Sequence, residues 1–98
     1  MGRYEQQFFV YIMTNRIRSV LYTGMTGDLK KRVWEHKQGF VDGFTKRYRV
    51  TLLMYYEIAG TAMAAIEREK QIKAGSRKKK EELISKINPE WLDLSDSL

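Results

Sequence analysis

The predicted fold rests on residues 8–23, which read FFVYIMTNRIRSVLYT. Two segments rich in aromatic and β-branched side chains, Phe8 to Met13 and Ser19 to Thr23, flank the polar stretch Thr14 to Arg18. Such segments favour β-strands, and the short polar connection between them favours an antiparallel hairpin. We therefore predict that the chain begins its folded part with two paired strands.

Each strand of this hairpin carries a tyrosine. Side chains alternate along a strand, so Tyr11 is expected to share a face with Phe9 and Met13. Tyr22 lies on the neighbouring strand and is expected to approach Tyr11 across the hairpin. Aromatic residues in strands are most often core residues, so neither tyrosine alone indicates a site.

Capping and breaking residues predict the elements that follow the hairpin. Gly24 and Gly27 interrupt the strand pattern, and Asp28 is a good N-cap for a helix that Gly39 ends. A third strand and two more helices follow, and Ser76 caps the last helix, which stops before the proline at position 89. The expected ranges are a helix over 28–38, a loop over 40–49, a strand over 51–58, helices over 61–74 and 76–88, and a frayed acidic tail from 93.

The composition fits one small domain that binds a polyanion. The chain has 98 residues, 43% of them hydrophobic, which suits a single domain over residues 1–98 with one core. Eighteen Lys and Arg against twelve Asp and Glu give a net charge of +6. Nucleic acid is the leading candidate partner, because an acidic membrane surface would call for a strongly amphipathic basic helix that the sequence lacks.

Other classes of protein are excluded by residues that are missing or rare. The chain has no Cys and one His, which excludes disulfides, thiolate metal sites and multi-histidine zinc sites. The apolar run Phe8 to Met13 is too short to span a bilayer and lacks the flanks of a signal peptide. We expect no membrane association and a cytoplasmic location.

Glu69 stands where an apolar side chain is expected. In a helix over 61–74, one stripe contains Ala62, Ala65, Ile66 and Ile72, and Glu69 falls within it. A carboxylate that is partly buried must be paired, protonated or bound to a cation. Two interpretations stay open at this point: a functional carboxylate, or an ordinary one that lies at a helix end near the surface or forms a salt bridge with a nearby Lys or Arg.

Arg32 and His36 form a second candidate pair. They are four residues apart on the first helix, beside the apolar residues Leu29 and Val33. Arginine matches the geometry of a phosphate, and histidine titrates near neutral pH. The pair could act on a phosphate and a proton together. The alternative is an ordinary solvated helix face, which is normally the preferred explanation for a single histidine.

A set of basic residues could follow a nucleic-acid backbone. Part of the set surrounds Glu69 and continues into the last helix, and the rest lies in the loop before the third strand. Solvation alone is the alternative for such a run, and contacts to phosphates would position DNA without reading its sequence. The candidate residues for nucleic-acid binding are Lys46, Arg47, Arg49, Arg68, Lys70, Lys73, Arg77, Lys78, Lys79 and Lys80.

Taken together, these positions resemble the GIY-YIG nuclease family. Phe9-Val10-Tyr11 and Tyr22-Thr23-Gly24 are relaxed versions of the two name-giving motifs, and they keep both tyrosines and the final glycine. The resemblance extends from about residue 8 to residue 91 and is strongest to the small stand-alone bacterial members, called the URI or UPF0213 type. The matching site residues, in chain order, are Tyr11, Tyr22, Arg32, His36, Glu69 and Asn88.

The resemblance implies an α+β fold, a three-stranded antiparallel sheet flanked by helices, and a DNA endonuclease of low sequence specificity. Glu69 would bind one Mg²⁺ or Mn²⁺, and Tyr11 would be the general base or orient the attacking water, aided by Tyr22 and His36. Arg32 would offset charge on the phosphate, and Asn88 would close the site. DNA repair or recombination is the implied setting.

Two features depart from the family pattern. Met25 stands where some excision-repair members have a lysine, so one phosphate contact is missing. Homing and repair members also carry separate domains that choose the target, so a protein partner is expected to supply specificity. The alternatives are a non-catalytic or partner-dependent nucleic-acid-binding module on the same fold, and a protein-interaction domain whose charge serves solubility.

Overall fold

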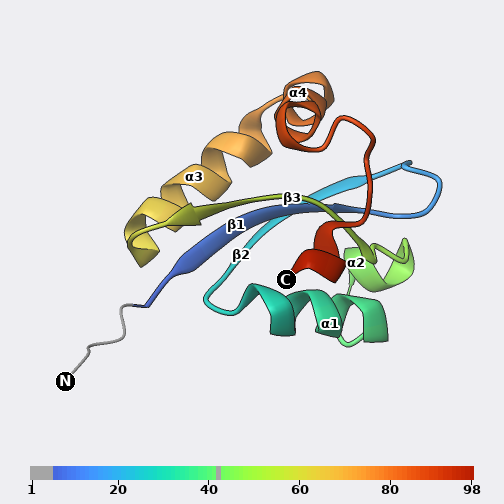
Figure 1. The fold of residues 1–98 in the computed structure, drawn as a ribbon, viewed down its shortest axis with the longest axis horizontal. Coiled ribbons are helices and arrows are strands. Elements are labelled where there is room, and N and C mark those ends of the chain that lie inside the picture. The colour runs from blue at the N-terminus through green and yellow to red at the C-terminus, as the bar shows by residue number, and fades with distance from the viewer. Residues whose placement is uncertain (1–5, 42) are drawn as a thin grey trace.

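The computed structural model describes residues 6–41 and 43–98, so residues 1–5 and 42 of the expected domain lie outside the described residues. A three-stranded antiparallel sheet forms its centre, in the order β2-β1-β3 (Figure 1). The strands are β1 (Phe8–Thr14), β2 (Leu21–Thr26) and β3 (Leu52–Ala59). The predicted hairpin, third strand and α+β fold are confirmed.

The strand register places residues of the two motifs opposite one another. Tyr11 of the central strand pairs with Gly24 of β2 on one side and with Tyr56 of β3 on the other. The expectation that Gly24 interrupts the second strand was wrong, because β2 continues through it. A glycine is tolerated there because a large side chain from the neighbouring strand occupies the space of its missing β-carbon.

Capping side chains begin three helices, at the predicted caps Asp28 and Ser76 and also at Thr61. Asp28, Thr61 and Ser76 each accept a hydrogen bond from a backbone N–H of the first helical turn. The segment over 40–49, expected to be a loop, contains a short helix of four residues. The helices are α1 (Leu29–Gln38), α2 (Phe44–Arg47), α3 (Ala62–Ala74), α4 (Arg77–Ile87) and a 3₁₀ helix, η1 (Leu94–Ser97). No helix in the described part of the chain has the length and apolarity to cross a membrane.

The helices divide between the two faces of the sheet (Figure 1). On one face Val10 and Ile12 of β1 pack with Ala65 of α3 and Ile84 of α4. On the other face Tyr11 and Met13 pack with Leu29 and Val33 of α1. Alternation along β1 thus sends successive side chains into two separate apolar layers. The sharing of one face by Phe9, Tyr11 and Met13 is confirmed.

The chain beyond Asp93 is not frayed, contrary to the sequence-based expectation. The Asp93 carboxylate accepts hydrogen bonds from the Leu53 backbone N–H at 3.0 Å and from Lys37 Nζ at 2.7 Å. It also caps η1, and Leu94 and Leu98 pack against the α1 side of the sheet. Composition alone could not show this, because the partners are far away in the sequence.

The apolar stripe of α3 is narrower than its sequence suggests. Ala65 and Ile72 are buried, whereas Ala62 and Ile66 are exposed. Glu69 therefore lies at the edge of the buried stripe instead of within it. Its half-buried carboxylate borders solvent, which lowers the energetic cost that the sequence pattern implied.

Candidate active site

Three aromatic rings from three elements meet on the α1 side of the sheet. Tyr11 comes from β1, Tyr22 from β2 and His36 from α1. Their ring centroids are 6.3 Å apart for the two tyrosines, 5.8 Å for Tyr11 and His36, and 5.6 Å for Tyr22 and His36. The Tyr11 hydroxyl is hydrogen-bonded to His36 Nε2 at 3.1 Å. The predicted approach of the two tyrosines is confirmed, and His36 completes the group.

Burial keeps both members of the hydrogen-bonded pair neutral. It raises the pKa of Tyr11 to about 12, and favourable interactions with Arg32 offset only part of that rise. Burial, reinforced by repulsion from Arg32, lowers the pKa of His36 to about 4. At neutral pH the phenol therefore retains its proton and the imidazole carries no charge. His36 Nδ1 is buried without a hydrogen-bond partner in the described structure.

Arg32 lies at the open side of this group. It stands one helical turn before His36, and its Nε donates a hydrogen bond to Glu35 at 3.2 Å. Its side chain remains 37% exposed, so the guanidinium can still meet a ligand from solvent. Arg32 thus combines an interaction with the Tyr11 hydroxyl and an accessible positive charge.

Glu69 approaches the same hydroxyl from α3. Its negative charge is close enough to Tyr11 to contribute to the raised pKa of the phenol. The Glu69 side chain is 20% exposed, and its Oε2 lies 3.4 Å from Lys73 Nζ. The salt bridge foreseen as the alternative interpretation is present, but it does not remove Glu69 from the vicinity of the tyrosine.

The residues around Glu69 fit a metal ion only at an open site. Within residues 6–41 and 43–98, no group of three or more His, Cys, Asp or Glu side chains could enclose a metal. Mg²⁺ and Mn²⁺ prefer oxygen ligands and keep water molecules, and one carboxylate with substrate phosphates is a known way to bind Mg²⁺. The single half-buried carboxylate of Glu69 meets that requirement.

Asn88 is not brought into this group. The residue ends α4, and its amide nitrogen donates to the carbonyl oxygens of Met54 at 3.0 Å and Leu92 at 2.7 Å. Its side-chain oxygen accepts a hydrogen bond from the Leu92 N–H at 2.9 Å. These bonds tie α4 and the chain after it to β3. They use both amide hydrogens, so the contacts of Asn88 indicate a structural role.

A polar hollow of about 470 Å³ opens beside Arg32. Its lining includes Lys31 and the backbone around Gly27 and Asp28, where the turn after β2 enters α1. Sequence reasoning did not select Lys31. Its place next to Arg32, in the first turn of a helix that follows a glycine-containing turn, was the available signal.

The predicted basic residues are distributed over separate surfaces. Arg68 forms hydrogen bonds with both carboxylate oxygens of Glu57, at 2.7 and 3.2 Å, and Arg77 pairs with Glu81 at 2.8 Å. Lys80 Nζ donates to backbone carbonyls at the end of α3. With Lys73, which pairs with Glu69, four charges of the set are thus engaged within the fold. Lys46, Arg47 and Arg49 lie in or just after α2, where Arg47 stacks on Tyr48.

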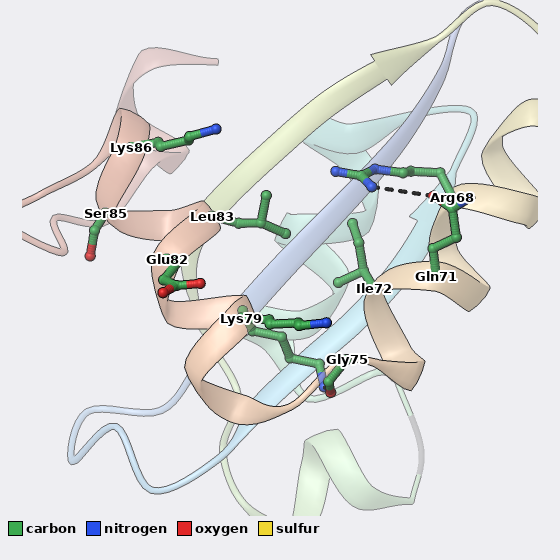
Figure 2. Close-up of a pocket in the computed structure, with 10 residues that line it drawn as sticks. Arg68, Gln71, Ile72, Gly75, Lys79, Glu82, Leu83, Ser85 and Lys86 are labelled. Atoms are coloured by element: carbon green, nitrogen blue, oxygen red, sulfur yellow. Dashed lines mark hydrogen bonds between the residues drawn. The ribbon is translucent and has the colours of Figure 1, made fainter.

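A larger groove, of about 620 Å³, separates α3 from α4 (Figure 2). Ile72 and Leu83 form its apolar floor, and Arg68, Lys79 and Lys86 stand around it. Arg68 and Glu69 lie on opposite sides of the buried stripe of α3, because each residue of a helix advances by about 100°. The groove and the group around Tyr11 therefore flank the same helix.

Comparison with known proteins places the chain in a family. A family model described as the GIY-YIG catalytic domain matches residues 7–82. This match covers most of the chain, and the protein belongs to the GIY-YIG family of nucleases.

Relatives of similar size share most of the chain. A UPF0213 protein of Staphylococcus saprophyticus is 40% identical over 77 residues, which is 79% of this chain and 93% of that protein. A UPF0213 protein of the archaeon Haloquadratum walsbyi is 39% identical over 75 residues, 76% of this chain and 83% of that protein. The solution NMR structure of a UPF0213 protein from Bacillus halodurans matches with a TM-score of 0.56 and 28% identity, over 89% of this chain and 92% of that one.

Proposed function

We propose that this protein is a metal-dependent DNA endonuclease that hydrolyses phosphodiester bonds with low sequence specificity. The observation that carries the proposal is the hydrogen bond between the buried Tyr11 hydroxyl and His36 Nε2. The charges of Arg32 and Glu69 are near enough to shift the pKa of that phenol. These four residues bring together a proton donor, a neutral proton acceptor, a cation and a carboxylate. Membership of a nuclease family supports the same conclusion.

The Tyr11 and His36 pair would move the proton of the attacking water. Since His36 is neutral at physiological pH, its Nε2 can accept the Tyr11 proton as the phenol oxygen takes one from water. The water oxygen then forms a bond to phosphorus, and the bond from phosphorus to the sugar oxygen breaks. The sugar oxygen leaves with the electron pair and takes up a proton from solvent, and His36, whose pKa is about 4, returns its proton to solvent. A phenolate never needs to accumulate, which matters because the pKa of Tyr11 is about 12.

The other site residues would bind the DNA and the metal ion and stabilise the transition state. The Arg32 guanidinium would offset the negative charge that develops on the phosphate, and Lys31 in the adjoining hollow would contact a neighbouring phosphate. Tyr22 packs against both rings of the pair and keeps them in place. Glu69 would hold one Mg²⁺ or Mn²⁺, which when bound supplies Lewis acidity at the phosphate.

Contacts to the backbone would provide affinity without reading bases. Lys46, Arg47 and Arg49 near α2, together with exposed Lys70 and Lys78, are the cations best placed for this task, because none of them forms a salt bridge within the described residues. Phosphate contacts position a protein on DNA but do not specify a sequence. Target choice would then come from a protein partner or from the structure of the DNA, in repair or recombination.

A second candidate is a nucleic-acid-binding module that does not turn over alone. The salt bridge between Glu69 and Lys73 favours it, because the lysine occupies the carboxylate that a metal would need. Since Lys73 is about half exposed and the pair is near solvent, a divalent ion at millimolar concentration should displace the ammonium.

A cleavage assay separates the two candidates. Purified protein is incubated with linear, nicked and branched DNA in the presence of Mg²⁺, Mn²⁺ or a chelator. The proposal expects metal-dependent cleavage without a fixed sequence at the cut. Binding to the same substrates without cleavage under any of these conditions would contradict the endonuclease and favour the binding module.

A further inference from the structure

The groove between α3 and α4 has the composition of a protein-docking site. Its floor is formed by Ile72 and Leu83, and exposed Ile87 continues the apolar line one turn beyond Leu83 on α4. Ile72 is only 4% exposed and belongs to the core, so the apolar surface that the groove presents to water comes from half-buried Leu83 and exposed Ile87. Such a surface favours an apolar ligand, and a volume of about 620 Å³ is large enough for several side chains. A groove between two helices is one kind of surface in which an amphipathic helix binds.

The rim of the groove carries unbalanced positive charge. The side chains of Lys79 and Lys86 lie on either side of Leu83 (Figure 2), and neither side chain forms a hydrogen bond or ion pair with the described residues. Lys80 also lines the groove, whereas Glu82 is its only acidic lining residue among those described. A partner that fills the groove must therefore bring negative charge beside its apolar side chains.

DNA fits this surface poorly. A phosphate placed over Ile72 and Leu83 would lose water without gaining a hydrogen bond from the floor, which is energetically costly. Two of the cations expected to line a DNA track here, Arg68 and Lys80, already bind Glu57 and the end of α3. The remaining positive charges at the rim, on Lys79 and Lys86, suit a ligand in which carboxylates flank an apolar side chain.

We propose that the groove between α3 and α4 binds an acidic amphipathic helix of a partner protein, with its apolar side chains against Leu83 and Ile87 and its carboxylates beside Lys79 and Lys86. The partner would contact the edge of α3 opposite to Glu69. This proposal does not depend on whether the protein cleaves DNA.

A synthetic helix tests it directly. The peptide carries leucines along one face and glutamates on both flanks, and a matched peptide carries lysines in place of the glutamates. Binding is followed by NMR on the labelled full chain. The acidic peptide should shift the amide signals of Gly75 and Leu83 and leave those of Tyr11 and His36 unchanged. The basic peptide should bind at least about tenfold more weakly.

Charge reversal on the protein makes the test specific. The double variant Lys79→Glu with Lys86→Glu should bind the acidic peptide about tenfold or more weakly than wild type and should bind the basic peptide more tightly. The matched control is Lys70→Glu with Lys78→Glu, since these lysines lie on the same two helices outside the groove lining. Equal effects of both double variants would overturn the proposal, as would displacement of the peptide by duplex DNA or signal shifts located outside the groove.

Discussion

The ring of Tyr11 lies over Gly24 of the neighbouring strand, so closely that a β-carbon on Gly24 would stand 2.6 Å from the Tyr11 hydroxyl oxygen. The two residues are direct partners in the sheet. This contact explains why the second motif ends in glycine at a position where β2 is otherwise regular. The missing side chain lets the phenol reach across β2 to His36.

Gly24→Ala should therefore displace the Tyr11 hydroxyl. The buried ring has no free space into which to move, so we expect a loss of about 1–3 kcal/mol in unfolding free energy from overpacking. Cleavage should fall roughly 100-fold, because the reacting hydroxyl is misplaced. Chemical denaturation and a cleavage assay measure the two effects. Gly60→Ala is the control, since a β-carbon there meets nothing within 4 Å. Full activity of the Gly24→Ala protein would show that the position of the phenol is unimportant.

Tyr11→Phe removes the hydroxyl and keeps the ring. We expect cleavage to fall by roughly 10²–10⁴-fold, the usual contribution of a general base, while DNA affinity stays close to that of the wild type. Single-turnover kinetics at saturating DNA is the suitable measurement. A rate within a few-fold of wild type would mean that Tyr11 has only a packing role.

Arg32→Ala should reduce the rate more than the affinity. A group that acts on charge developing in the transition state contributes to the rate beyond ground-state binding, and its removal should cost about 10²–10³-fold in turnover. Lys31→Ala, in the same hollow, should instead weaken DNA binding with little change in the rate at saturation. Equal losses of affinity and rate for Arg32→Ala would make it a plain phosphate anchor.

His36 should make stability depend on pH in the mildly acidic range. Its pKa is lowered from 6.5 to about 4 in the folded protein, so the unfolded chain binds more protons between these values. Stability from this residue is complete above pH 6.5 and is lost as the pH falls from 6.5 towards 4, by up to about 3 kcal/mol.

The relevant measurement is urea denaturation of wild type and His36→Phe at several pH values. The difference between the two proteins isolates His36 from Glu57 and Asp93, whose lowered pKa values act on stability at lower pH. The unfolding free energy of wild type minus that of His36→Phe should decrease as the pH falls. A difference that stays constant from pH 7 to pH 4.5 would contradict a buried, neutral histidine.

Asn88→Ala should destabilise the protein without a specific effect on chemistry. The substitution leaves the buried carbonyl of Met54 and the N–H of Leu92 without their partners, which costs about 2–3 kcal/mol. Thermal denaturation checks the loss, and turnover measured well below the melting temperature should be retained within a few-fold. A stable variant with abolished turnover would restore Asn88 to the reaction.

The sequence predicted the sheet, the capped helices and the meeting of the two tyrosines because each depends on local pattern or on strand pairing. Features that depend on distant contacts escaped it. Asp93 looked like part of a loose tail, although its carboxylate binds Leu53 and Lys37. The breadth of the α3 stripe was overestimated, since periodicity does not tell how much of a helix the sheet covers.

In the candidate site, too, the sequence predicted some features and missed others. Motif spacing identified Tyr11, Tyr22 and His36, and the structure brings their rings together. A count of basic residues does not show which of them already form salt bridges within the fold. Arg68 and Arg77 are two that do. The apolar groove between α3 and α4 was invisible in the sequence because its floor combines Ile72 and Leu83 from separate helices.

Two glutamates on α3 allow metal-dependent cleavage to be assigned to one carboxylate. Glu69→Ala removes the half-buried carboxylate near Tyr11, and Glu67→Ala removes an exposed one two residues earlier. Both proteins should fold, and their cleavage of DNA is measured across a titration of Mg²⁺ and Mn²⁺. We expect metal-dependent cleavage by wild type and Glu67→Ala and none by Glu69→Ala. Unchanged metal-dependent cleavage by a folded Glu69→Ala protein would contradict it.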